Sequence, residues 1–162
     1  MKRLFLILLF FSAFLLFSCG AEYGILDYQS KDIVAECQIN GKYRVELKKE
    51  DSTCLITILE PKEAYGITFE IYEDIAYVST GDVRIEMNKG DIKGICAIGE
   101  MFSQSEECLT SATEQGKGSV LTFQKEECTY QITLGEHSVP KNIKILSEAF
   151  EYNVDILSIE LK

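Results

Sequence analysis

From Ile33 onward, apolar and polar residues alternate along most of the chain, which is the pattern of β-strands with one buried face. In the first such segment Ile33, Ala35, Cys37 and Ile39 alternate with mostly polar neighbours. Turn-forming residues separate the segments that follow. The pattern predicts a meander of short antiparallel strands over 33–39, 43–47, 53–59, 66–72, 75–79 and 82–88.

The turn after the first strand contains Asn40 and Gly41. Residues paired across two antiparallel strands face the same side of the sheet. The apolar residues of both strands have odd numbers here, so a register that puts them on one face pairs residues whose numbers have an even sum. A two-residue Asn40-Gly41 loop makes that sum odd and puts the two apolar sets on opposite faces. We predict instead a three-residue loop over 39–41 with a left-handed Gly41, which pairs Cys37 with Tyr43.

The period changes to three and four residues over about 91–115, which predicts one long amphipathic helix with a single apolar stripe. Gly94 and Gly99 weaken this helix near its start, and the Gly-Lys-Gly segment over 116–118 ends it. The stripe consists of Ile92, Ile95, Ile98, Phe102, Ser105, Leu109 and Ala112.

Strands resume after the helix, over 120–124, 128–134, 142–146 and 152–161. In the last of them Val154 and Ile156 have one parity and Leu157 and Ile159 the other, which a β-bulge near Ile156 explains. A helix that interrupts a meander packs most naturally on the concave face of the sheet. We therefore predict one mainly β (α+β) domain over 25–162. It is a curved antiparallel sheet or half-open β-barrel of about ten strands, with the helix on its concave face.

The start of the chain has a different character. A short cationic segment, Met1-Lys2-Arg3, precedes a run over 4–17 that is apolar except for Ser12. The run has 14 residues, whereas a transmembrane helix needs roughly 20. A cationic start, a short apolar run and small residues after it are typical of an export signal, so we predict a cleaved signal peptide over 1–18. A membrane-spanning anchor that stays attached is the alternative.

The segment Leu16-Phe17-Ser18-Cys19 resembles the bacterial lipoprotein box, which has an aliphatic residue, two small residues and an obligatory cysteine. Phe17 is bulkier than the residue usually found at its position. The resemblance implies diacylglycerol on the Cys19 thiol, cleavage before Cys19 and acylation of the new amine. Two or three acyl chains hold a protein firmly, because each buried CH₂ contributes about 0.8 kcal/mol. We therefore expect lipidation of Cys19 and a place on the extracytoplasmic face of a bacterial membrane. Ordinary secretion, with cleavage one or two residues further on, is the alternative.

Processing before Cys19 removes Lys2 and Arg3 and no acidic residue, which leaves 14 basic and 26 acidic side chains and a net charge of −12. Such a charge repels nucleic acid and anionic lipid surfaces, so no nucleic-acid partner is expected. The same charge favours solubility, and we predict a monomer that the tether over 19–24 holds close to its membrane.

Catalytic motifs are absent from the sequence, which contains no G-x-S-x-G, no H-E-x-x-H and no phosphate-binding loop. The single histidine, His137, lies among polar residues and is interpreted as a surface residue. Acidic residues gather only as adjacent pairs, whose side chains point in different directions and make poor metal ligands. The sequence therefore predicts no enzyme activity, no metal site and no cofactor.

Five cysteines follow Cys19, and an odd number leaves at least one thiol unpaired within the chain. Cys96 and Cys108 fall on the predicted helix about 18 Å apart, too far for a disulfide between them. Whether the others form disulfides or are buried thiols stays open. The five are Cys37, Cys54, Cys96, Cys108 and Cys128.

Residues 25–162 resemble the superfamily of periplasmic lipoprotein carriers, half-open β-barrels that hold helices across the mouth. The resemblance rests on Pro61, on the Gly-Ile-Thr-Phe segment 66–69 that leads to a strand ending at Gly81, on the later helix, and on Val139-Pro140 before two final strands. It implies an apolar cavity that shelters acyl chains, although some relatives sense or regulate.

Two functions follow as alternatives. The first is a carrier that holds an apolar ligand such as a lipid or acyl chain, which requires a dry pocket of at least about 300 Å³. The second is an interaction, sensor or assembly protein with an envelope protein as its partner, which requires a filled core and an exposed apolar patch. In the first case, the apolar faces of strand 66–72 and of the helix would line the cavity, through Ile67, Phe69, Ile71, Ile95, Ile98, Phe102 and Leu109.

Overall fold

The computed structural model describes residues 28–29, 31–115, 118–135 and 138–162. The signal peptide predicted over 1–18, Cys19, the tether and His137 lie outside these residues. Among the residues described, no helix is long and apolar enough to span a membrane. The strands are β1 (Ile33–Ile39), β2 (Tyr43–Glu50), β3 (Thr53–Glu60), β4 (Thr68–Ile71), β5 (Ala76–Thr80), β6 (Val83–Met87), β7 (Leu109–Gln115), β8 (Gly118–Lys125), β9 (Cys128–Leu134), β10 (Pro140–Leu146) and β11 (Glu151–Leu161).

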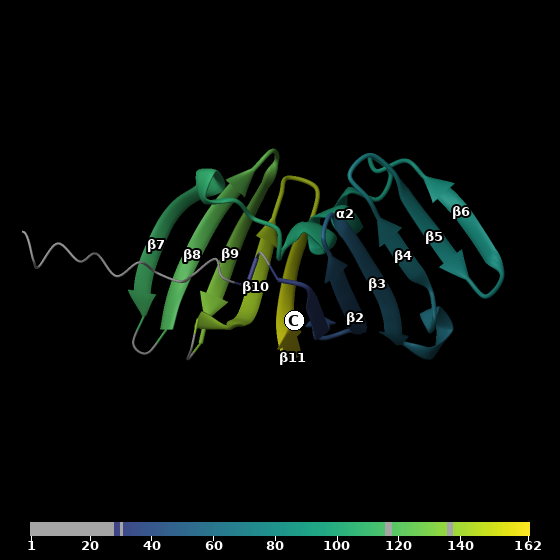
Figure 1. Cartoon of the computed structure of the whole chain (residues 1–162), viewed down its shortest axis with the longest axis horizontal. Helices are drawn as coiled ribbons and strands as arrows, with labels where there is room; N and C mark the ends of the chain where they lie inside the picture. Colours follow the sequence, from purple (N-terminus) through teal and green to yellow (C-terminus); the bar gives the residue numbers. More distant parts are fainter. Residues whose placement is uncertain (1–27, 30, 116–117, 136–137) are drawn as a thin grey trace, which may run out of the picture.

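All eleven strands belong to one antiparallel sheet in the order β6-β5-β4-β3-β2-β1-β11-β10-β9-β8-β7 (Figure 1). The sheet therefore consists of two meanders, β1–β6 and β7–β11, which are joined where β1 pairs with β11. It is curved and does not close, since β6 and β7 are both edge strands. This confirms the predicted half-open antiparallel architecture.

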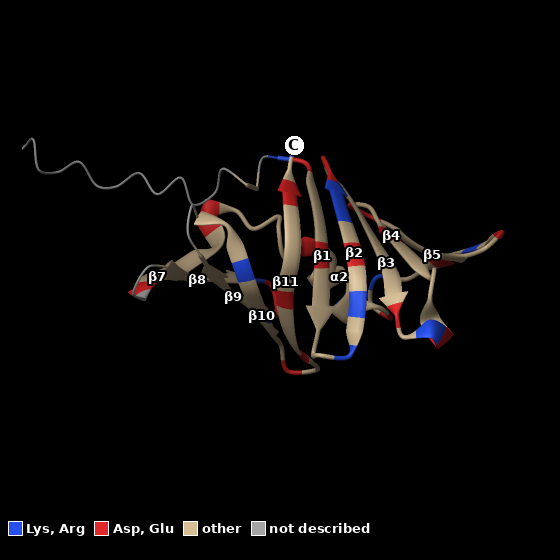
Figure 2. Cartoon of the chain, turned by 90° about the horizontal axis from the view of Figure 1, so that it is seen from below, with Lys and Arg blue, Asp and Glu red and all other residues tan. Residues whose placement is uncertain are grey.

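The two faces of the sheet differ in chemistry. Figure 2 shows Lys, Arg, Asp and Glu positions distributed along β11, β1 and β2, with the helix behind these strands. Ion pairs cross the outer face, such as the one between Arg44 of β2 and Glu36 of β1. The inner, concave face carries the alternate residues, which are apolar and buried at the centre of the sheet. The period-two pattern of the sequence thus arises because alternate residues lie on these two different faces.

The helix is much shorter than predicted. Helix α2 covers Lys93–Glu100, a 3₁₀ turn follows at Glu106–Cys108, and the second half of the predicted helix is strand β7. A β-bulge explains the misleading spacing. Leu109 pairs with Phe123 and Ala112 pairs with Leu121, so β7 has one residue more than β8 between these two pairs. Leu109 and Ala112 therefore face the same side although they are three residues apart. The spacing that resembles a helix over 109–115 therefore comes from a bulged strand.

Two predictions of register have opposite outcomes. The first hairpin has three loop residues, but they are 40–42, because Ile39 pairs with Tyr43 and Cys37 with Val45. The predicted pairing of Cys37 with Tyr43 is wrong, since the observed register keeps Ile39 in the strand and buries it. The predicted bulge in the last strand is confirmed next to Ile156: Cys37 pairs with Ile156 and Glu36 with Ser158, which leaves one extra residue.

Candidate functional site on the concave face

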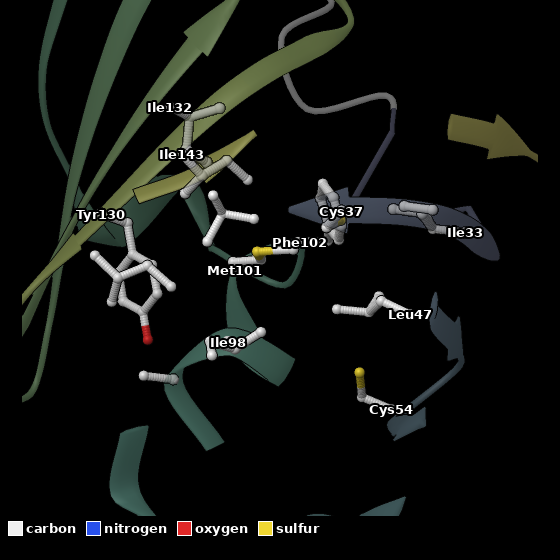
Figure 3. Close-up of a cluster of buried hydrophobic side chains, with 14 of the residues drawn as sticks. Ile33, Cys37, Leu47, Cys54, Ile98, Met101, Phe102, Tyr130, Ile132 and Ile143 are labelled. Carbon is white, nitrogen blue, oxygen red and sulfur yellow. The ribbon is translucent and has the colours of Figure 1, made fainter. Parts of the chain in front are cut away.

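The middle of the concave face is filled by α2 and the residues that follow it. Ile98, Met101 and Phe102 have 2%, 0% and 0% of their surfaces exposed. Figure 3 shows them between Tyr130, Ile132 and Ile143 on one side and Cys37, Leu47 and Cys54 on the other. This segment therefore fills the space between the two meanders and completes the hydrophobic core.

Gly99 lets the helix approach the sheet closely. A Cβ atom at this position would lie 2.7 Å from Cδ1 of Ile71 in β4 and 3.6 Å from Sγ of Cys54 in β3. A glycine costs stability inside a helix, but here it brings the backbone of α2 against β3 and β4. The contact holds α2 against β3 and β4.

One row of side chains crosses the concave face from the covered centre to an uncovered edge. Consecutive strand pairings connect its members, so all six face the same side of the sheet. The row runs through Ala35, Leu47, Ile56, Phe69, Val78 and Ile85. The first three are buried, Phe69 and Val78 are half-buried, and Ile85 is 53% exposed. An apolar surface therefore opens toward β6.

Further apolar residues widen this surface, which we call the β4–β6 face. Val83 shares the inward parity of Ile85 and is 55% exposed. Ile58 of β3 is half-buried and packs against the edge of the core. Ile67, just before β4, is also half-buried. In Figure 1 α2 lies near the centre of the sheet, while β5 and β6 extend away from it.

The predicted cavity residues fall into three groups. Ile71, Ile98 and Phe102 are buried in the core, and Phe69 and Ile95 pack against it. Ile67 lies at the start of the β4–β6 face. Leu109 is separate from all of them: it begins β7, at the opposite end of the strand order, and is 36% exposed. Its inclusion depended on the long helix, and the structure does not bring it to the other six.

Sequence reasoning missed Val78, Val83 and Ile85 as members of one surface. The alternation that marks them is present in the sequence, but their place beside Phe69 depends on which strands are neighbours. Extending the parity rule across successive hairpins would have found the row, because each tight turn makes sequential strands adjacent.

Two cavities flank α2, and their linings combine charged, polar and apolar groups. One, of about 720 Å³, lies on the side of β3 and β4. The other, of about 820 Å³, lies on the side of β8 and β9. Lys89, Glu100, Lys125 and Glu126 line both cavities, and Lys125 Nζ is 2.8 Å from a carboxylate oxygen of Glu100. Both exceed the volume that an apolar ligand needs, but an acyl chain in either would also lie against charged side chains, which lose hydration when they are covered.

The cysteines in this region are thiols. Cys37, Cys54 and Cys96 are buried, Cys108 and Cys128 are half-buried, and none forms a disulfide. Burial raises the pKa of both Cys37 and Cys54 to about 12, so these thiols stay protonated and act as small apolar side chains. The argument that placed Cys96 and Cys108 on one helix is wrong, because α2 ends before Cys108. Within the described ranges, no three His, Cys, Asp or Glu residues are close enough to hold a metal ion.

Comparison with known proteins gives similar folds only among solved structures. No protein-family model matches the chain, and no curated protein matches it significantly. An uncharacterized conserved protein from Thermus thermophilus is 11% identical, with 85% of each chain covered and a TM-score of 0.48. A LolA superfamily protein from Nitrosomonas europaea is 10% identical over 86% of this chain and 92% of its own, with a TM-score of 0.42. A putative outer membrane lipoprotein-sorting protein domain from Vibrio parahaemolyticus is 7% identical over 85% and 91%, with a TM-score of 0.43.

Proposed function

We propose that this chain is a membrane-anchored extracytoplasmic binding protein that holds an apolar ligand, such as the acyl chain of a lipid, on the β4–β6 face. The observation that carries the proposal is the row from Ile56 to Ile85, in which burial falls steadily while every residue stays apolar. A soluble domain gains nothing from leaving Val83 and Ile85 more than half exposed on its inner face. A ligand lying along this row would cover them.

The chemistry of the surroundings favours an uncharged or weakly polar ligand over an anionic one. The processed chain has a net charge of −12, which disfavours the approach of anions. Covering one exposed isoleucine contributes about 1.5–3 kcal/mol at most, so several residues of the row must be covered together for useful affinity. An extended aliphatic chain crossing β4, β5 and β6 meets that requirement.

A titration with a neutral apolar dye, such as N-phenylnaphthylamine, tests the proposal. Val78→Thr keeps the shape of the side chain but adds a hydroxyl to the middle of the row. Val120→Thr is the matched control, because Val120 is also half-buried in a strand but lies on the outer face. We expect Val78→Thr to raise the Kd for the dye about tenfold, since an uncompensated hydroxyl costs about 1–3 kcal/mol. The control should bind like the wild type. No dye binding by the wild type, or equal weakening by both variants, would overturn the proposal.

The filled core under α2 favours a second candidate, an interaction protein that uses the β4–β6 face for an envelope protein. Ile98, Met101 and Phe102 are buried between the helix and the sheet. Native mass spectrometry of the chain extracted from its membrane separates the two. A co-purifying mass of lipid size supports the carrier, and a protein-sized partner supports the second candidate.

A further inference from the structure

The side chains of the edge strand β6 follow a pattern that is complementary to itself when the strand is reversed. From Val83 to Met87 it reads apolar, cationic, apolar, anionic, apolar, with Ile85 at the centre. Arg84 and Glu86 lie on the outer face of the sheet, and the three apolar residues lie on the concave face. An antiparallel copy of this strand placed alongside would therefore match it in both charge and polarity.

The backbone of β6 is also ready to pair. Thr80 and Val83 close a two-residue turn, so they form a hydrogen-bonded pair. Hydrogen-bonded and non-hydrogen-bonded pairs alternate along an antiparallel ladder. The backbone groups of Ile85 and Met87 therefore also bond to β5. The N–H and C=O groups of Arg84 and Glu86 then point away from the sheet. Within the described part of the chain, β6 has no neighbour on that side.

The other edge strand does not offer a comparable surface. Strand β7 carries a bulge between Leu109 and Ser111, and bulges are a usual protection of edge strands against pairing. Strand β6 pairs with β5 over its full length without a register shift. Only β6 therefore combines a regular edge with exposed apolar residues, Val83 and Ile85.

We propose that β6 pairs with β6 of a second copy of this chain, antiparallel, about a two-fold axis through Ile85. In this register Arg84 lies opposite the partner's Glu86, and the two-fold axis repeats this pair once. The outward N–H and C=O groups of the two pairs form four backbone hydrogen bonds in total. Val83 lies opposite the partner's Met87. Pairing centred on Arg84 or on Glu86 would place like charges opposite each other, which destabilises a strand pair. Charge thus selects one register.

The side chain of Arg84 is fixed on the outer face of its own sheet, over β5 and β4. Its Nε and Nη2 donate to Glu70 at 3.2 and 2.6 Å, and its guanidinium lies 3.7 Å from the centre of the Tyr77 ring. Nη1 forms neither of these bonds. Glu86 has no ion pair within the described residues, so it is available to the partner's Arg84. The opposite charges of Arg84 and the partner's Glu86, at paired positions on the outer face, make the pairing symmetric and complementary.

Such a contact is small, with five residues from each copy, and interfaces of this size are weak in dilute solution. Anchoring both copies to one membrane raises their effective concentration and favours pairing. The sequence alone predicts a monomer, and this proposal replaces it with a weak dimer in the membrane. It does not depend on whether the β4–β6 face binds a ligand.

Disulfide cross-linking of the full chain, expressed in a bacterial host and oxidised in isolated envelope membranes, tests the proposal. In the proposed register the two Ile85 Cα atoms lie about 4.5 Å apart, within the range of a disulfide, whereas the two Val83 Cα atoms lie about 14 Å apart. Ile85→Cys should therefore give a disulfide-linked dimer, and Val83→Cys should give no more dimer than the wild type. The two positions are matched controls, since their exposures are 53% and 55%. Mixing Val83→Cys with Met87→Cys should restore the dimer. Peptide mass spectrometry identifies the linked residues.

Charge exchange in the Ile85→Cys background supplies a second measurement. Adding Glu86→Arg should lower the dimer yield at least severalfold, because each Arg84 then faces an arginine. Coexpressing that variant with an Ile85→Cys chain carrying Arg84→Glu should restore the yield as mixed dimers. Glu160→Arg, on the outer face of β11, makes the same change in net charge and should have no effect. Equal cross-linking at positions 83 and 85, no dimer with Ile85→Cys, or no restoration on coexpression would overturn the proposal.

Discussion

Replacing Phe102 by alanine should destabilise the protein by about 3–5 kcal/mol, the full cost of removing a phenylalanine from a filled core. Phe102 has no exposed surface, and its ring meets that of Tyr28 edge to face, with 6.4 Å between the centroids. Ile98 and Met101, which precede it, are equally buried. The surrounding strands are fixed by their ladders, so little of the new cavity can collapse.

Urea unfolding followed by far-ultraviolet circular dichroism measures this loss, because the chain contains no tryptophan to serve as a fluorescent reporter. The chain from Ala21 onward, without its lipid, is the suitable material, and its spectrum should be dominated by β structure. Leu157→Ala is the control: Leu157 is 51% exposed, so its loss should change the free energy of unfolding by no more than about 0.5 kcal/mol. A loss below about 1.5 kcal/mol for Phe102→Ala would refute the reasoning, since it would mean that Phe102 already borders open space.

Three further predictions follow from particular residues. Cys19→Ser should abolish incorporation of labelled fatty acid and release the chain from the membrane fraction; normal labelling would contradict the lipid anchor. Gly99→Val should cost about 1–3 kcal/mol in urea melts, because the added side chain meets Ile71, and an unchanged stability would show that α2 can move away from β4. Burial raises the pKa of Cys37 and Cys54 from the ordinary 9.0 to about 12, so above pH 9 the unfolded chain loses these protons first. Stability should therefore be complete below pH 9 and fall as the pH rises toward 12, and replacing both cysteines by alanine should reduce that slope.

Most strands could be predicted because their alternation reports a local property, the difference between the two faces of the sheet. The bulge near Ile156 was visible for the same reason, as a change of parity within one strand. The helix was predicted too long because a bulge in β7 gives Leu109 and Ala112 a spacing of three residues. One period can thus arise from two structures, and only the pairing with β8 distinguishes them.

The candidate site was predicted less well than the strands. Phe69, Ile71 and Ile98 were recognised as apolar residues of the inner face, but parity does not tell which of them α2 covers. That depends on where Gly99 lets the helix approach, which places α2 over β3 and β4. Ile85 therefore stays exposed, although its sequence pattern resembles that of the buried Ile56.

The pairing of β1 with β11 has a consequence for the export that we propose for this chain. The seam at the middle of the sheet joins a strand that begins at Ile33 with one that ends at Leu161, so it cannot form until the last strand, β11, has been synthesised. Until then the two meanders have no common core, and contacts between residues so distant in sequence form slowly. A chain that cannot complete its core early stays unfolded during synthesis. We therefore expect it to remain threadable through an export channel for longer than a fold built from local contacts.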